Sequence, residues 1–307
     1  MATEEDGTFE LADARWPLFL QEHGYAVIRS VASTEDVEKA RAMFWEVFEQ
    51  RGVLQSDTST WSQLGVAGDH GILFDGAMIQ SNAAWFIRGL PKIHTAFERI
   101  WETADLIVSM DSTIAWLPWW LEPEWRPHTE GLHLDQNPFQ KPGLDCVQGM
   151  VPLYDVTPAS GGLEVCPDSH LPAAKKQFCA LHPQLAGRGQ FLPLPKNNPL
   201  RGTGKLLQAR AGDLILWDSR TIHGGKVGTG EPDTAAGGAA GPQLARLAQT
   251  VCMTPRARAS IHVLEQRQRG PADGLGFNHC PHEANVSSRA RKPYTPPSLS
   301  ADQLRLL

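Results

Sequence analysis

The 307-residue sequence contains no long hydrophobic run, and this absence excludes a class of proteins. No stretch approaches the roughly 20 consecutive apolar residues that a membrane-spanning helix requires. The first residues, Met1 to Asp6, are acidic and lack the apolar segment of a secretory signal. We therefore expect no membrane span and a cytoplasmic or other intracellular location.

Paired cysteines and blocks of like charge are also missing. The five cysteines, Cys146, Cys166, Cys179, Cys252 and Cys280, form no Cys-x-x-Cys pair. An odd, scattered set is typical of reduced thiols rather than of a disulfide framework. The formal net charge is only −6 and is spread along the chain, so nucleic acid is not an expected partner.

The chain divides into three regions by pattern. We expect residues 1–10 to be a flexible N-terminus, residues 11–283 to form a single domain and residues 284–307 to form a C-terminal tail. Within the domain, apolar residues at helical spacing predict a helical part over 11–105. One helix is expected with Ser33 or Thr34 as its N-cap, and a second helical stretch from Ala84 to Thr103.

Short strands separated by Gly, Pro and Asp turns follow over about 106–256. This pattern favours an antiparallel sandwich or small barrel over alternating strands and helices. The fold class expected is therefore mainly β with flanking helices (α+β). Residues 226–243 are rich in Gly, Ala and Thr and read as a low-complexity insert.

Two short stretches carry candidate metal ligands. In the first, His133 and Asp135 stand two residues apart, so on a strand their side chains leave the same face. In the second, an apolar strand that begins after Gly212 ends near His223. Two imidazoles and a carboxylate can bind one face of an octahedral metal, as in non-haem Fe(II) oxygenases, and leave positions for a co-substrate and dioxygen. Alone, each motif also occurs by chance, and a histidine at a strand end is often only hydrogen-bonded.

Two residues are candidates for binding a co-substrate. Arg246 opens an apolar strand, and a guanidinium group matches a carboxylate with two parallel hydrogen bonds. Inside a barrel it would hold the far carboxylate of a dicarboxylate, whereas on the surface it would only form an ion pair. Gln148 lies on the strand after the His-x-Asp motif, and its side chain would contact the same ligand if that face points inward.

These motifs together resemble those of the phytanoyl-CoA dioxygenase-like family of Fe(II)/2-oxoglutarate-dependent oxygenases. The resemblance spans about Trp16 to Thr254. The matching motifs are His133-Leu134-Asp135-Gln136, Gly161-Gly162-Leu163, Pro167-Asp168-Ser169-His170, Gly212-Asp213, His223-Gly224 and the strand from Arg246.

The resemblance implies a double-stranded β-helix (jelly-roll, cupin-like) core. It further implies Fe(II) held by His133, Asp135 and His223, with 2-oxoglutarate anchored by Arg246. The insert before Arg246 is longer than is usual in the family.

The predicted reaction is hydroxylation of an unactivated C–H bond of a small organic substrate, with release of succinate and carbon dioxide. Fe(II), 2-oxoglutarate as co-substrate and dioxygen are required, and ascorbate is a candidate reductant. Halogenating relatives replace the carboxylate with a small residue, so Asp135 favours hydroxylation. Desaturation, cyclisation, substrate identity and oligomeric state stay open.

Two other functions remain in competition: a non-catalytic jelly-roll that binds a metal or ligand, and a 2-oxoglutarate-independent metalloenzyme on the same barrel.

Other residues are weaker candidates for the same chemistry. His170 resembles a ligand but is expected to lie in a structural turn, and His128 in a loop. Near the C-terminus, His279, Cys280 and His282 could form a metal cluster, although their spacing matches no zinc motif.

Overall fold

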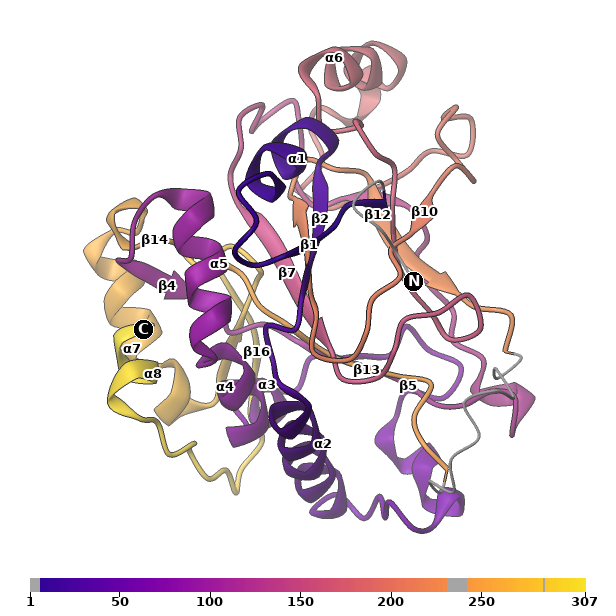
Figure 1. The fold of residues 1–307 in the computed structure, drawn as a ribbon, viewed down its shortest axis with the longest axis vertical. Helices are drawn as coiled ribbons and strands as arrows, with labels where there is room; N and C mark the ends of the chain where they lie inside the picture. The colour runs from indigo at the N-terminus through magenta and orange to yellow at the C-terminus, as the bar shows by residue number, and fades with distance from the viewer. Residues whose placement is uncertain (1–5, 231–241, 284) are drawn as a thin grey trace.

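The computed structural model describes residues 6–230, 242–283 and 285–307, and two β-sheets form its centre (Figure 1). In spatial order, the larger sheet contains β1 (Thr8–Glu10), β2 (Tyr25–Arg29), β11 (Leu214–Asp218), β7 (Val147–Pro152), β13 (Arg246–Thr250), β5 (Thr113–Trp116) and β3 (Ile72–Leu73). The smaller sheet contains β10 (Lys205–Leu206), β8 (Gly161–Val165), β12 (His223–Val227), β6 (His133–Leu134) and β9 (Leu192–Pro193). Two further pairs are β14 (Met253–Pro255) with β4 (Leu106–Val108) and β15 (Leu275–Phe277) with β16 (Val286–Arg289).

Side chains alternate between two cores along the strands of the larger sheet. On β11, Ile215 and Trp217 join Leu163 and Val165 of the smaller sheet in one cluster. The intervening Leu214 and Leu216 belong to a second cluster with the helices. This alternation follows from the two-residue period of a strand. One face of the larger sheet therefore packs against the smaller sheet, and the other face packs against the helices.

The helices cover the outer face of the larger sheet and the ends of the molecule. They are α1 (Trp16–His23), α2 (Thr34–Glu49), α3 (Gly76–Ile79), α4 (Asn82–Arg88), α5 (Pro91–Trp101), α6 (Pro172–Leu181), α7 (Ile261–Asp273) and α8 (Ala301–Arg305). Figure 1 shows α5, α7 and α8 gathered on one side of the molecule, away from β10 and β12. Within the described ranges, no helix has both the length and the apolar character needed to cross a membrane.

The expected mainly β class with flanking helices is confirmed, but two local expectations are corrected. Residues 8–10, expected in a flexible N-terminus, form β1 and pair in parallel with β2. The helical stretch expected from 84 to 103 is two helices, because the chain turns at Gly89 and Pro91 begins α5.

Other segments were not foreseen or cannot be compared. Helices α6 and α7 had no counterpart in the sequence prediction, and α7 contains Pro271 near its end. Of the expected insert 226–243, residues 231–241 lie outside the described residues, as do residues 1–5 and 284.

Helix α2 begins with reciprocal hydrogen bonds between Ser33 and Asp36. The Ser33 hydroxyl accepts from the Asp36 amide at 3.1 Å, and the Asp36 carboxylate accepts from the Ser33 amide at 2.9 Å. Replacing Ser33 with Ala removes one acceptor, so we expect Ser33→Ala to lower the free energy of unfolding by about 1 kcal/mol. Urea denaturation measures this loss. The exposed Ser56 is the matched control, and an equal effect of Ser56→Ala would contradict the capping role.

Candidate metal centre

Two histidines and an aspartate meet at the start of two paired strands. His223 opens β12 directly opposite His133 of β6, so their imidazole rings lie side by side with centroids 4.5 Å apart. Asp135 follows β6, and its two carboxylate oxygens lie 3.2 Å from His223 Nε2 and 3.7 Å from His133 Nε2. One ligating atom from each residue lies within 4.8 Å of the others, so all three could bind one metal ion.

Backbone carbonyls fix the protonation of both imidazoles. His133 Nδ1 donates to the Gly131 carbonyl, and His223 Nδ1 donates to the Thr221 carbonyl, each at 2.9 Å. A carbonyl oxygen only accepts, so the proton of each neutral ring is on Nδ1. Both Nε2 lone pairs are therefore free toward Asp135, the arrangement typical of metal-binding histidines.

Burial and local charge give these groups the ionisation that a metal requires. Burial by itself would raise the pKa of Asp135, but the facing His223 and the charge of His279 hold that pKa well below the usual range. Burial, together with the neighbouring His223, lowers the pKa of His133. A carboxylate beside neutral imidazoles is the state that binds a cation.

Gln148 joins the metal-ligand candidates to the larger sheet. Its Nε2 donates to Asp135 Oδ2 at 2.9 Å, and its side chain is buried. In the described residues Gln148 thus orients Asp135, and its predicted contact with 2-oxoglutarate stays a prediction.

Arg246 lies in the same interior, one strand away from Gln148. Its guanidinium packs over the Trp116 ring, 4.5 Å from the centroid, and Nη2 lies 3.2 Å from Met150 Sδ. Met150 is two residues after Gln148 on β7, so both side chains point to the same side of the sheet. Burial lowers the pKa of Arg246 to about 10, so the group is still charged at neutral pH. Among the residues that the structure describes, its Nε has no hydrogen-bond acceptor.

Comparison with known proteins gives the family and the fold. The family model for phytanoyl-CoA dioxygenase (PhyH) matches residues 20–230, more than half of the chain. The chain belongs to the phytanoyl-CoA dioxygenase family. The matched range includes His133, Asp135 and His223 but ends before Arg246. Because the family consists of Fe(II)/2-oxoglutarate-dependent oxygenases, membership supports an oxidoreductase.

One relative and two solved structures extend this likeness over most of the chain. Ava biosynthesis cluster protein O of Aspergillus versicolor is 28% identical over 287 residues, which cover 87% of this chain and 86% of that protein. A hypothetical protein of Escherichia coli has a TM-score of 0.59 at 16% identity, with 98% of this chain and 85% of that chain covered. SnoK, a non-heme α-ketoglutarate-dependent carbocyclase from nogalamycin biosynthesis, has a TM-score of 0.50 at 18% identity, with 79% and 84% covered. These structures confirm the double-stranded β-helix core.

One residue beside the metal-ligand candidates, Trp217, was not expected there from the sequence. It lies opposite Gln148 in the pairing of β11 with β7, and its ring centroid is 5.4 Å from that of His223. The indole Nε1 is buried and has no acceptor in the described part of the chain. The sequence contained a signal for Trp217. Ile215 and Trp217 alternate along the strand before His223, which predicts that their side chains and that of His223 lie on the same face.

The structure gives the weaker sequence candidates other partners. His170 Nε2 lies 2.9 Å from the Gln21 carbonyl, and His128 Nδ1 lies 2.7 Å from the Gly68 carbonyl, so both act in local structure. Trp116, Trp119 and Trp125 are buried in the larger hydrophobic cluster. His279 and Cys280 come together with Cys146 rather than with the metal-ligand candidates.

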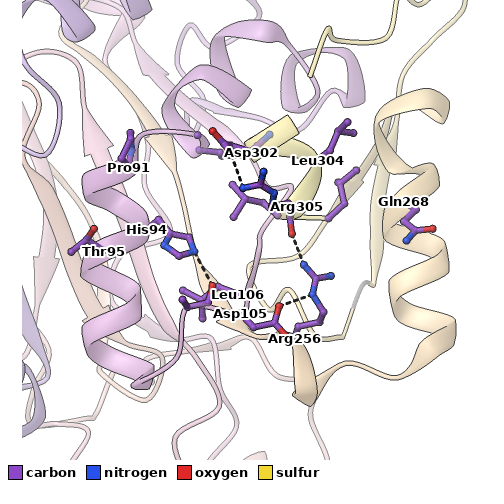
Figure 2. A pocket seen from close by; sticks show the side chains of 15 residues that line it. Pro91, His94, Thr95, Asp105, Leu106, Arg256, Gln268, Asp302, Leu304 and Arg305 are labelled. Carbon is purple, nitrogen blue, oxygen red and sulfur yellow. Dashed lines mark hydrogen bonds and ion pairs between the residues drawn. The ribbon is translucent and has the colours of Figure 1, made fainter. Parts of the chain in front are cut away.

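The larger of the two described cavities, about 900 Å³, is a groove distant in the fold from the metal-ligand candidates. Figure 2 shows it between α5, α7 and α8, with Arg256 paired to Asp105 and Arg305 paired to Asp302. None of His133, Asp135, His223 and Arg246 lines it. The groove therefore contributes nothing to the candidate metal centre.

The hydrogen bond from Gln148 to Asp135 predicts a measurable effect on metal affinity. Gln148→Leu keeps the side-chain volume but leaves the Asp135 carboxylate without this donor, so Mn²⁺ affinity should fall about 10- to 100-fold. Equilibrium titration with Mn²⁺, a cation that prefers oxygen and imidazole ligands, measures it. The control is Gln63→Leu at an exposed position on a 3-10 helix (Thr58–Leu64). Unchanged affinity in Gln148→Leu would contradict the orienting role.

Proposed function

We propose that this chain is an Fe(II)- and 2-oxoglutarate-dependent dioxygenase that hydroxylates an unactivated C–H bond of a small organic substrate. The observation that carries the proposal is the buried, positively charged Arg246 beside the metal-ligand candidates. A buried charge is costly unless it is paired. An anionic co-substrate would supply that missing partner.

The donor set supports iron as the metal. His133, Asp135 and His223 offer two nitrogens and one carboxylate oxygen, the facial set typical of non-haem Fe(II) oxygenases. Free Nε2 lone pairs and an ionised Asp135 need no rearrangement of protons before an ion binds. Three protein ligands leave the other positions of an octahedral ion to small molecules.

The position of Arg246 supports 2-oxoglutarate as the co-substrate. Gln148 contacts Asp135 while Met150, two residues along β7, contacts Arg246. Two residues span about 7 Å along a strand, which suits a short diacid with one end at the metal and the other at the guanidinium. The buried indole N–H of Trp217 and the unpaired Nε of Arg246 are donors available to such an anion.

Bound iron and 2-oxoglutarate supply the oxidising chemistry, in which dioxygen is consumed and succinate and carbon dioxide are released. The chain's own residues prepare the site for it. The carbonyls of Gly131 and Thr221 hold both imidazoles in the binding tautomer, and Gln148 holds the Asp135 carboxylate. Asp135 also supplies the carboxylate that halogenating relatives replace with a small residue, and its presence favours hydroxylation. Ascorbate is a candidate reductant.

The two competing functions fit these observations less well. The intact set of His133, Asp135 and His223 together with the buried Arg246 favours an enzyme over a non-catalytic jelly-roll that binds a metal or ligand. A metalloenzyme that works without 2-oxoglutarate has no use for a buried cation at the position of Arg246. Membership in an oxygenase family also favours the first function.

Iron and 2-oxoglutarate together should give a weak visible charge-transfer band under anaerobic conditions. We expect His133→Ala to abolish the band, because one of the three ligands is lost. Absorption spectroscopy of the wild-type and variant chains measures it, with His128→Ala as the control because His128 is occupied by the Gly68 carbonyl. A wild-type chain without the band would favour the non-catalytic function.

Removing the guanidinium of Arg246 should specifically weaken the binding of 2-oxoglutarate. We expect Arg246→Met to raise the KM for 2-oxoglutarate at least about 30-fold, equivalent to about 2 kcal/mol, because a buried charge pair is lost. Succinate release, screened over a metabolite library with the wild-type chain, supplies the assay and identifies the substrate. The control is Arg256→Met in the groove of Figure 2. Equal KM values in the two variants would argue for a 2-oxoglutarate-independent enzyme.

A further inference from the structure

A second group of metal-ligating side chains joins the larger sheet to the C-terminal part of the chain. Cys146 directly precedes β7, while His279 and Cys280 follow β15. One ligating atom of each residue lies within 4.8 Å of the other two. Both thiols are buried, and all five cysteines of the chain are free of disulfides. Residues 134 positions apart in sequence thus meet at one point.

The distance between the two sulfur atoms separates the possible states of this cluster. Cys146 Sγ and Cys280 Sγ are 3.7 Å apart. A disulfide would place them at about 2.05 Å. Two thiolates bound to one tetrahedral zinc, each at about 2.3 Å from the metal, lie about 3.8 Å apart. This spacing excludes a disulfide and matches that of two ligands of a shared ion, and without an ion the Cys280 thiol donates a hydrogen bond to Cys146 Sγ.

The Asp145 carboxylate also lies next to this group, with Oδ2 3.8 Å from Cys280 Sγ. That carboxylate is already paired with Lys141, Arg258 and His282, so it is not counted among the ligands. The ligand set is therefore two thiols and one imidazole.

We propose that Cys146, His279 and Cys280 hold a zinc ion in a structural site that is separate from the candidate iron centre. Thiolates combined with an imidazole are typical zinc ligands, whereas the set of His133, Asp135 and His223 has no sulfur and is typical of non-haem iron.

The zinc ties the segment after β15 to the strands that frame the iron centre. A cavity of about 30 Å³ is lined by Asp135 and Gln136 on one side and by His279 and Cys280 on the other. The zinc site and Asp135 therefore lie next to the same cavity. Loss of the zinc would release the C-terminal segment from this side of the candidate iron centre.

Cobalt substitution tests the site in the full-length chain. The reduced chain, stripped of metal and loaded with Co²⁺, should show sulfur-to-cobalt charge transfer and the visible bands of a tetrahedral ion, and zinc should displace both. Cys146→Ser and Cys280→Ser should lose the sulfur-to-cobalt signal. The controls Cys166→Ser and Cys179→Ser, cysteines outside the cluster, should retain it.

The same measurement separates this site from the iron centre. His133→Ala should retain the sulfur-to-cobalt signal, because the iron-centre candidates contain no thiol. Zinc should also protect Cys146 and Cys280 of the wild-type chain from alkylation, a readout that needs no variant. Absence of sulfur-to-cobalt charge transfer in the wild-type chain, or full alkylation in the presence of zinc, would overturn the proposal and leave a hydrogen-bonded thiol cluster. The iron-dependent function could still hold in that case.

Discussion

The pairing of β12 with β6 is the constraint on which the candidate metal centre depends. It places His223 opposite His133, ninety residues earlier in the chain, and sets the two imidazoles side by side. The carbonyls of Thr221 and Gly131 accept hydrogen bonds from the two Nδ1 atoms. One strand pairing therefore fixes both the position and the tautomer of two candidate ligands. The third candidate, Asp135, lies on the same face because it is two residues beyond His133.

The alternation of side chains on the larger sheet decides what surrounds this centre. Gln148, Trp217 and Arg246 point toward the smaller sheet, while Leu216 and Leu247 pack against the helices. A shift of one residue in register would exchange these faces and bury leucine where the chain now presents hydrogen-bond donors. The charged Arg246 in that interior is unfavourable for the isolated chain and favourable for an anionic ligand.

The chain contains two groups of candidate metal ligands with different chemistry. The nitrogen and oxygen atoms of His133, Asp135 and His223 suit a reactive iron, and the thiols and imidazole of the second group suit zinc. Asp135 of the first group and His279 of the second line the same small cavity. In this arrangement, the C-terminal segment beyond β15 supports a site that is built from strands much earlier in the chain.

The sequence alone determined the features that depend on neighbouring residues. A helix cap at Ser33 or Thr34, the alternation of the strands and the His133-x-Asp135 motif are local patterns, and the family resemblance rests on such motifs. Only the tertiary structure brought Cys146 to Cys280, placed Trp217 beside His223 and showed that Arg246 is buried without an acceptor in the described residues. These facts depend on strand register and on contacts between distant segments, because local spacing fixes which way a side chain points but not what it meets.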